Sequence, residues 1–463
     1  MAYKTINPYT GKELKSFPTA TDEEVDQAIE DAHKAFLSWR ESSFKERADL
    51  MRGVARILRE RKEEYASLIT LEMGKLLSEA RGEVELSAQI AQYYADYAAD
   101  ELAPRVLASK DFAEGAVQLV NDPLGVLFIV EPWNFPFYQI IRVAAPQLSA
   151  GNTIVMKDAS NIPQCAAAFE EIFKEAGAPK GVFRNLYISH DQSDRIIANP
   201  LIRGVALTGS EKAGAAVAEA AARSLKKSTL ELGGSDAFIV LEDADVQKAA
   251  SWAAIGRNWN AGQVCVSSKR LIVTDAVYDE FLEAYRSHVA QLRAGDPRDP
   301  STTLAPLSSA SAVRLLTKQV DEAVAHGATL EYLGSSVPEE GFFFQPAILT
   351  NVTKDNPAYS QEFFGPVAQL FRVADEQAAI ELANDSPFGL GGSVFTRDIE
   401  RGRQVARRLD TGMVYINQPT KVAADIPFGG VKHSGYGHEL IDLGIHEFVN
   451  QKVVGVADID GKF

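Results

Sequence analysis

Cysteine is nearly absent from this sequence, because its 463 residues include only Cys165 and Cys265. Two thiols cannot build a disulfide framework, so we expect a protein of a reducing compartment that folds without cross-links. Long apolar runs are missing too: no stretch of about 18 apolar residues occurs, and residues 1–20 lack a signal-peptide core. These absences predict a cytoplasmic protein that does not span a membrane.

Basic charge is also scarce. The chain has 47 Lys and Arg residues against 63 Asp and Glu residues, which gives a formal net charge of -16 and argues against a nucleic-acid partner. The histidines show no ligand spacing, so no metal site is expected. Apolar residues, in contrast, make up 46% of the chain, enough for large cores in roughly three units of about 150 residues each.

The first hundred residues have the periodicity of helices. Thr21 and Glu24 form a capping box ahead of apolar residues at helical spacing. Further helices are expected over residues 44–61 and 75–97, and another over 163–177.

Short strands follow this helical region. They are expected at residues 116–120 and 125–130, after which strands alternate with helices as far as Val240 and again over 269–415. The alternation predicts doubly wound parallel sheets in an α/β fold. The strand expected at 448–456 has no local partner, so we expect it to pair elsewhere, as in another subunit.

Cys265 lies in a polar loop that contains Gly262. An isolated cysteine is usually a small buried hydrophobe, and this is our interpretation of Cys165 within its expected helix. A loop-borne thiol is different, because a base or a lowered pKa makes it a nucleophile. Glu231, earlier in the chain, is a carboxylate that could activate water to release what the sulfur has captured.

A possible phosphate site occurs where an apolar strand ends at Thr208, Gly209 and Ser210 and a helix opens at Glu211. Free N–H groups and a positive dipole end suit a pyrophosphate there. The motif alone is weak, because many strand-to-helix turns use Gly and Ser and no G-x-G-x-x-G pattern is present.

Two further residues follow strands. Lys157 ends the strand 153–157, and ligands of open parallel sheets bind beyond the carboxyl ends of the strands. Asn134 lies between Pro132 and Pro136, where a stiff loop would aim its amide at an oxyanion. The alternatives are a solvated lysine and a packed aromatic corner.

Together these residues resemble the aldehyde dehydrogenase superfamily over essentially the whole chain, most of all its bacterial succinate semialdehyde dehydrogenases. The matching stretches are Pro132-Trp133-Asn134-Phe135-Pro136, the strand ending at Lys157, Leu207-Thr208-Gly209-Ser210, Glu231-Leu232-Gly233-Gly234, Gly262-Gln263-Val264-Cys265, Glu362-Phe363-Phe364-Gly365-Pro366 and Pro427-Phe428-Gly429-Gly430. The resemblance implies that Cys265 attacks an aldehyde. Asn134 and the Cys265 N–H would hold the oxyanion, and Glu231 would activate water to give a free acid rather than a coenzyme A ester.

The resemblance also implies a nicotinamide cofactor and no metal. The residues it assigns to the cofactor are Trp133, Lys157, Ser160, Thr208, Gly209, Ser210, Leu232, Gly233, Glu362 and Phe364. Many NAD-preferring relatives carry a glutamate where this chain has Ser160, whose hydroxyl with Lys157 suits a 2′-phosphate. We therefore predict NADP as the preferred cofactor and NAD as a second, although Asp158 adds a nearby negative charge.

For the substrate, Arg142 matches the position at which semialdehyde dehydrogenases bind a distal carboxylate. An internal ion pair is the alternative, because a buried arginine needs a partner. A second arginine of these relatives is replaced by Trp259, which with Phe135 and Phe428 would form apolar walls. The leading substrate is succinate semialdehyde, oxidised to succinate, and the alternative is another small aldehyde or semialdehyde such as glutarate semialdehyde.

Two other classes of protein remain open. A cysteine hydrolase would leave Lys157, Thr208 and Glu362 unexplained. A non-catalytic scaffold on the same fold would retain Cys265 and Glu231 without turnover. Neither would reduce NAD(P)+ in the presence of aldehydes.

The resemblance implies three parts and a homo-oligomer. They are a dinucleotide-binding domain of residues 1–113 and 126–232, a catalytic domain of residues 233–432, and an oligomerisation arm of residues 114–125 and 446–463. The arm implies a homodimer or a homotetramer.

Overall fold

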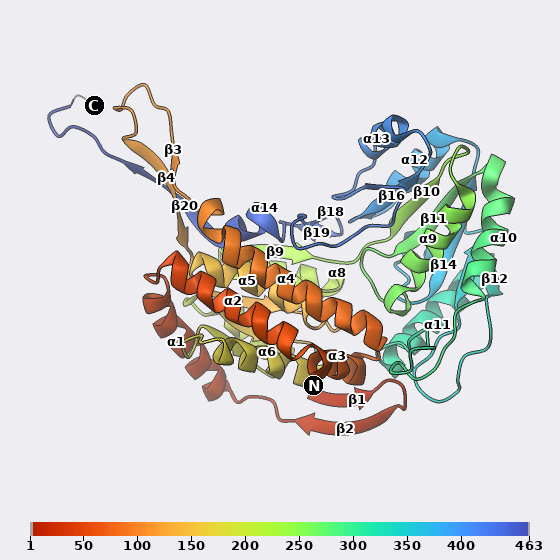
Figure 1. The fold of residues 1–463 in the computed structure, drawn as a ribbon, viewed down its shortest axis with the longest axis horizontal. Helices are drawn as coiled ribbons and strands as arrows, with labels where there is room; N and C mark the ends of the chain where they lie inside the picture. The colour runs from red at the N-terminus through yellow and green to blue at the C-terminus, as the bar shows by residue number, and fades with distance from the viewer. Residues whose placement is uncertain (1–2, 462–463) are drawn as a thin grey trace.

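The computed structural model describes residues 3–461, in which two α/β lobes lie side by side and a narrow sheet projects from one of them (Figure 1). Residues 1–2 and 462–463, at the ends of the predicted ranges 1–113 and 446–463, lie outside the described residues. No helix within residues 3–461 combines the length and the apolarity needed to cross a membrane.

The first lobe is built on a six-stranded sheet in which five strands run parallel. In spatial order its strands are β19 (Gly435–Tyr436), β9 (Lys227–Glu231), β8 (Ile202–Thr208), β5 (Val126–Val130), β6 (Thr153–Lys157) and β7 (Phe183–Asn185). Strands β5 and β6 are apolar almost throughout, as expected for central strands that are covered on both faces. The strand predicted at 153–157 is confirmed.

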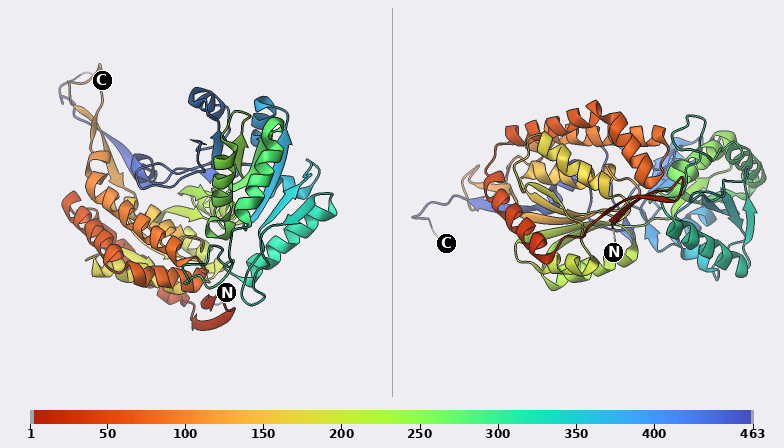
Figure 2. Two further views of the ribbon diagram at one scale, coloured as in Figure 1. Left: turned by 45° about the vertical axis from the view of Figure 1, so that its right-hand side comes forward. Right: turned by 90° about the horizontal axis from the view of Figure 1, so that it is seen from below.

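Helices cover both faces of this sheet (Figure 2). They are α1 (Asp22–Trp39), α2 (Phe44–Glu60), α3 (Lys62–Met73), α4 (Leu77–Glu101), α5 (Tyr138–Ala150), α6 (Pro163–Glu175), α7 (His190–Ala198) and α8 (Glu211–Arg223). The predicted capping box is confirmed, because Thr21 Oγ1 accepts from the Glu24 N–H and the Glu24 side chain accepts from the Thr21 N–H. Helix α3 was not predicted, nor was the hairpin of β1 (Tyr3–Asn7) and β2 (Lys12–Phe17).

The second lobe contains a seven-stranded sheet. In spatial order its strands are β12 (Thr329–Tyr332), β13 (Ala347–Thr350), β14 (Val367–Val373), β11 (Ser268–Thr274), β10 (Asp236–Val240), β16 (Gly392–Phe395) and β17 (Tyr415–Ile416). Only the edge strand β12 runs antiparallel. Two mostly parallel sheets, each covered by helices, confirm the predicted doubly wound α/β fold.

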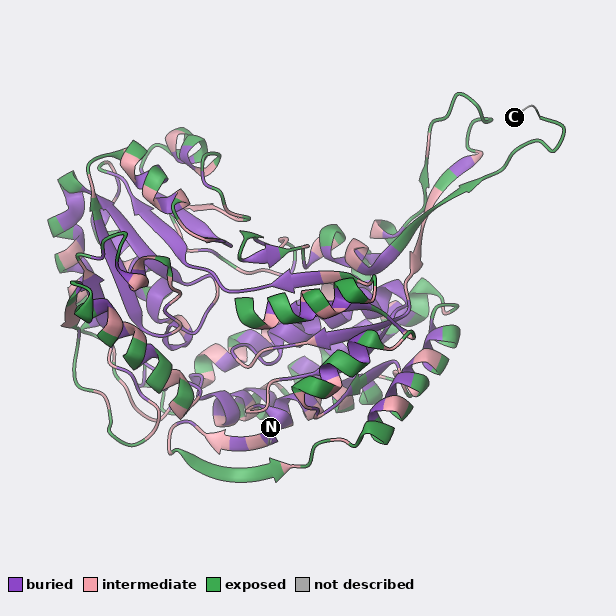
Figure 3. Cartoon of the chain, turned by 180° about the vertical axis from the view of Figure 1, so that it is seen from behind, coloured by how far each residue is buried: buried purple, intermediate pink, exposed green. Residues whose placement is uncertain are grey.

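The central strands of both sheets are buried, and the outward faces of the helices around them are exposed (Figure 3). The helices of the second lobe are α9 (Val246–Asn258), α10 (Tyr278–Val289), α11 (Ala310–Ala325), α12 (Glu376–Asn384) and α13 (Ile399–Ala406). A short ladder of β15 (Phe388–Gly389) and β18 (Val431–Lys432) precedes the return of the chain through β19 to the first sheet, and α14 (Ile441–Ile445) follows.

The projecting sheet has three strands, β20 (Val449–Gly455), β4 (Val117–Pro123) and β3 (Arg105–Val106). The terminal strand pairs antiparallel with β4 along its whole length. The partner expected elsewhere is therefore distant in sequence, and it lies in the same chain rather than in another subunit. Strand β3 also begins earlier than the predicted range 114–125.

Helix α4 fixes the start of helix α5 through a buried carboxylate. Glu83 Oε1 accepts from the N–H groups of Phe137 and Tyr138, at 2.8 and 3.2 Å. Its other oxygen contacts the ammonium group of Lys75, and both side chains are buried. Because α5 has no side-chain cap of its own, Glu83 supplies the acceptor that its first turn needs.

We expect Glu83→Ala to lower the free energy of unfolding by about 3–5 kcal/mol, because it leaves the Lys75 ammonium buried and unpaired. Urea denaturation followed by circular dichroism measures the loss. Glu219→Ala is the control, since it removes an exposed partner of Arg223 and should cause no comparable loss. Equal stabilities of the two variants would contradict this role of Glu83.

Candidate active site

A cavity of about 410 Å³ lies between the two lobes, and its lining comes from both. The predicted residues that line it are Trp133, Asn134, Thr208, Gly209, Ser210, Leu232, Gly233, Cys265, Glu362 and Phe364. The lining that was not predicted comprises Pro132, Gln139 and the start of α11, namely Ser309, Ser311, Ala312, Leu315, Leu316 and Gln319. Apart from the helix cap at Ser309, this part of α11 carries no sequence signal for a site.

The backbone before Cys265 is left-handed at three consecutive residues, Asn260, Ala261 and Gly262, with φ of 51, 52 and 77°. A Cβ on Gly262 would lie 2.4 Å from the Gly365 carbonyl oxygen, so the turn requires glycine there. The turn packs the thiol loop against the segment that carries Glu362. The turn lies within the segment Trp259–Gly262, which directly follows the last residue of helix α9.

Asn134 lies next to this turn. Its Nδ2 donates to the Gln263 carbonyl oxygen at 3.1 Å, and its own carbonyl oxygen accepts from Asn260 Nδ2 at 3.0 Å. An amide NH2 group has two donors, so one of them remains for a ligand in the cavity. Among residues 3–461, the Cys265 N–H donates to no protein acceptor. Two donors are therefore available beside the thiol.

The Cys265 thiol is half-buried, whereas Cys165 is fully buried within α6. Burial raises the pKa of the Cys265 thiol to about 11, although the positive charges of Arg142 and Lys269 oppose that rise. A base must therefore take the proton before the sulfur can react at neutral pH.

Glu231 ends strand β9 with a buried carboxyl group. Neither of its oxygens has a hydrogen-bond partner within the described residues 3–461. Burial raises the pKa of this carboxyl to about 8, and Arg142 limits the rise. The side chain does not line the cavity, but its charge and that of the Cys265 thiol both act on Arg142.

Arg142 is fully buried behind the cavity rather than in its lining. Its guanidinium donates to Tyr138 Oη at 3.1 Å and to Thr208 Oγ1 at 3.3 Å, and forms an ion pair with Glu439. It also lies over the Phe428 ring, 4.5 Å from the centroid. The internal ion pair raised as the alternative is thus present, and the role of a substrate anchor stays a prediction.

The predicted apolar walls pack together beside the thiol loop. The rings of Phe135 and Trp259 have centroids 5.0 Å apart, and both belong to the core around the cavity together with Phe428. None of the three lines the cavity itself, so they lie on its inner side.

Lys157 and Ser160 are farther along the edge of the first sheet and do not line the cavity. Lys157 is nearly buried and donates to the Asp158 carbonyl oxygen at 3.2 Å. The Asp158 carboxyl is fully buried, and burial raises its pKa well above the usual range. Its negative charge is therefore suppressed rather than directed at a ligand.

The turn at the start of α8 fits a dinucleotide phosphate. Ser210 caps this helix through its hydroxyl oxygen, and the first N–H groups of the helix face the cavity end. A Cβ on Gly209 would meet no protein atom closer than 3.5 Å, so packing does not require glycine there. A glycine that lines a cavity without a packing reason is typical of close approach by a ligand.

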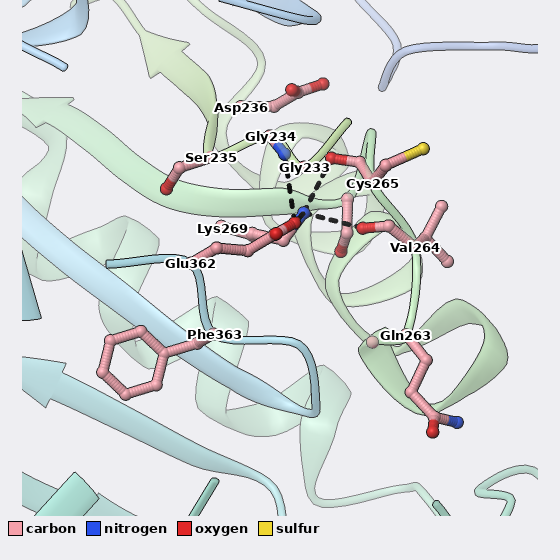
Figure 4. Close-up of polar contacts among 12 residues, drawn as sticks. Gly233, Gly234, Ser235, Asp236, Gln263, Val264, Cys265, Lys269, Glu362 and Phe363 are labelled. Atoms are coloured by element: carbon pink, nitrogen blue, oxygen red, sulfur yellow. Dashed lines mark hydrogen bonds and ion pairs between the residues drawn. The ribbon is translucent and has the colours of Figure 1, made fainter. Parts of the chain in front are cut away.

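Two buried cations near the thiol were not predicted, Lys269 and Arg257. Lys269 lies among the carbonyl oxygens of Val264 and Cys265 and the Glu362 carboxylate (Figure 4). Arg257 donates to the Phe363 carbonyl oxygen at 2.7 Å and to Ser267 Oγ at 2.6 Å. The contact of Lys269 with Glu362 and that of Arg257 with Phe363 join segments far apart in sequence, so no local pattern predicts them. Within residues 3–461 no cluster of His, Cys, Asp or Glu side chains could hold a metal ion.

Comparison with known proteins identifies the family. The sequence profile of the aldehyde dehydrogenase family matches residues 1–454. The chain belongs to the aldehyde dehydrogenase family. It is therefore an enzyme that oxidises aldehydes with a nicotinamide cofactor, as the motifs predicted.

Relatives of this aldehyde dehydrogenase match it over nearly its full length. A succinate-semialdehyde dehydrogenase [NADP(+)] of Deinococcus radiodurans is 49% identical, over 98% of this chain and 94% of the relative. A probable succinate-semialdehyde dehydrogenase [NADP(+)] of Synechocystis is 44% identical, over 99% of this chain and 100% of the relative. The crystal structure of succinic semialdehyde dehydrogenase from Streptococcus pyogenes with NADP+ superposes with a TM-score of 0.96 at 46% identity, over 99% of this chain and 100% of that chain.

We expect Gly209→Ala to fold with wild-type stability but to raise KM for the nicotinamide cofactor several-fold, because the added methyl group would occupy the space that the cofactor needs. Steady-state kinetics and urea denaturation measure the two effects. Gly82→Ala, in a helix with nothing within 4 Å of the added carbon, is the control and should leave KM unchanged. An unchanged KM in Gly209→Ala would refute the assignment.

Proposed function

We propose that this aldehyde dehydrogenase oxidises succinate semialdehyde to succinate, with NADP+ as the preferred cofactor and NAD+ as a second one. One observation carries the proposal: Cys265 and Asn134 open onto the same cavity as the Thr208–Ser210 turn and Glu362. A thiol, an amide donor and a dinucleotide turn thus meet at one place. The names of the full-length relatives support the choice of substrate and cofactor.

Cys265 is proposed as the nucleophile. Its Sγ bonds to the aldehyde carbon, and the electron pair moves to the oxygen, which the free Asn134 amide N–H and the Cys265 N–H hold. Each such donor contributes up to about 3 kcal/mol. A nicotinamide cofactor held by the Thr208–Ser210 turn and Glu362 would supply the hydride acceptor, and loss of hydride from the carbon would leave a thioester on Cys265.

Glu231 is proposed as the base. It takes a proton from water as the water oxygen bonds to the thioester carbon, after which the carbon–sulfur bond breaks and the carboxylic acid leaves. The thiol regains a proton and the site returns to its starting state. Glu231 is also proposed to take the thiol proton at the start, because burial disfavours the thiolate.

Steady turnover should rise with pH through about 8. Burial raises the pKa of Glu231 to about 8, so the base form grows as the pH passes that value and then levels off. Glu231→Gln should keep a burst of reduced cofactor in stopped-flow absorbance and lose steady turnover and its pH dependence. Steady turnover at the wild-type rate in this variant would refute the assignment.

The proposed preference for NADP+ rests on Lys157 and Ser160. A serine at this position leaves room for a 2′-phosphate and a donor to it, and Lys157 adds positive charge. The buried, proton-favouring carboxyl of Asp158 does not oppose this charge.

Arg142 is the proposed cation for the distal carboxylate of the substrate. Its ion pair with Glu439 means that a substrate carboxylate would share a guanidinium already engaged in the protein. We therefore propose that the charge of Arg142, placed behind the thiol, attracts the substrate carboxylate. Phe135 and Trp259 would form apolar walls around the carbon chain.

A chain-length series of aldehydes with and without a terminal carboxylate, assayed at 340 nm with NADP+ and NAD+, tests substrate and cofactor together. We expect the highest kcat/KM for succinate semialdehyde with NADP+. Arg142→Ala should raise KM for the carboxylated aldehydes much more than for uncharged aldehydes of equal length. A preference for NAD+ would overturn the cofactor choice, and equal KM changes would overturn the anchor.

We also propose a homo-oligomer in the cytoplasm. The projecting sheet exposes Val453, Val454 and Val456, and helix α9 exposes Trp252 and Ile255. Apolar side chains gathered on a projecting sheet and a helix face suit a second copy of the chain. Size-exclusion chromatography with light scattering would distinguish a dimer from a tetramer. We also keep as proposals the residue ranges given from the sequence for the cofactor domain, the catalytic domain and the arm.

A further inference from the structure

Lys269 lies at the start of β11 with its ammonium group buried beneath the thiol loop. Its Nζ is 2.6 Å from the Val264 carbonyl oxygen and 2.7 Å from that of Cys265. The same Nζ is 3.0 Å from Glu362 Oε1, and the lysine side chain is only 1% exposed. In Figure 4 the Cys265 carbonyl points toward the ammonium group and the sulfur points away from it. One buried cation thus joins the thiol loop to the Glu362 carboxylate, which is assigned to the cofactor.

Glu362 is held from a second side. Its Oε1 also accepts from the Gly234 N–H at 3.1 Å, and a Cβ on Gly233 would lie 2.2 Å from its other oxygen. Lys269 and the Gly233–Gly234 backbone therefore fix the carboxylate between them. Loss of Lys269 would release one of these two restraints.

Arg257 supports the same two segments in a different way. It donates to the carbonyl oxygens of Gly262 and Phe363, but it makes no hydrogen bond or ion pair with the Glu362 carboxylate within the described residues. The backbones of the two segments would therefore stay connected without Lys269. Lys269 adds a positive charge between the Glu362 carboxylate and the backbone of Cys265.

We propose that Lys269 is a positioning residue of the reaction. Its ammonium group holds the Cys265 loop and the Glu362 carboxylate in a fixed relation, and its charge favours the thiolate form of Cys265. The inference rests on the proposed function, because it takes Cys265 as the reactive thiol.

The charges around the thiol support this role. The charged groups with the largest effect on its pKa are Arg142 on α5, Lys269 on β11, Asp236 on β10 and Glu362 ahead of β14. Burial raises the pKa of the thiol most, Arg142 and Lys269 lower it, and the two carboxylates raise it. Removal of Lys269 would take away one favourable charge and leave the Glu362 carboxylate uncompensated, so both effects act against the thiolate.

The test is the pH dependence of Cys265 alkylation by iodoacetamide, with the modified residue identified by peptide mass spectrometry. Lys269→Gln should move the midpoint to higher pH by about one unit, as expected for a charge lost within a few ångströms. It should also raise KM for the cofactor, because Glu362 loses a restraint. Lys269→Arg should keep the midpoint near the wild-type value, and Glu362→Gln should move it to lower pH.

Lys75→Gln is the matched control, since Lys75 is another fully buried lysine paired with a glutamate. It should lose stability without moving the alkylation midpoint. A wild-type midpoint in Lys269→Gln would overturn the proposal. If Lys269→Gln does not fold, Glu362→Gln is the test instead, and a wild-type alkylation midpoint in Glu362→Gln would overturn the proposal. Absence of Cys265 alkylation in the wild-type enzyme would instead refute the proposed function, and this inference with it.

Discussion

The left-handed turn at Asn260, Ala261 and Gly262 is the constraint on which the rest of the site depends. Left-handed backbone costs a residue other than glycine about 1–2 kcal/mol, and two such residues stand here in succession. Hydrogen bonds offset this cost: Asn260 donates through its side chain to the Asn134 carbonyl oxygen, and Gln263 Nε2 donates back to the Asn260 carbonyl oxygen at 3.1 Å. The same bonds that stabilise the turn therefore bring Asn134 beside the thiol.

Helix α4 supports both sides of this arrangement from one face. Glu79 Oε1 accepts from the Asn260 N–H at 3.2 Å, and Glu83, one turn later, accepts from the first N–H groups of α5. Residues four apart share a helix face, so one rigid surface fixes the thiol turn and the helix that follows Asn134. Burial raises the pKa of Glu79 to about 7. Protonation of this carboxylate below that pH would weaken the hydrogen bond that it accepts from the Asn260 N–H.

Local signals predicted the parts of the fold that depend on neighbouring residues. The capping box at Thr21 and the strand ending at Lys157 follow from short patterns, and the family motifs found the cavity residues because each motif is a contiguous stretch. Lys269 and Glu83 escaped prediction for the opposite reason. A lysine within a strand and a glutamate within a helix look like ordinary surface residues, and only the packing of distant segments buries them. The terminal strand has no local signal for its partner either, because β4 is more than three hundred residues away, and only the family resemblance grouped the two ranges in one arm.

Arg142 places one buried charge where it acts on both groups proposed for the reaction. Its guanidinium lowers the pKa of the Cys265 thiol and that of the Glu231 carboxyl, each of which burial raises. Burial makes each additional charge unfavourable, so one negative charge shared by Cys265 and Glu231 costs less free energy than a negative charge on each of them. Transfer of a proton from Cys265 to Glu231 moves that charge from carboxylate to sulfur within reach of the same guanidinium. The net charge of the buried site would then be unchanged when the nucleophile forms. The negative charge later leaves with the hydride, so Glu231 would have to release its proton to solvent before it could activate water.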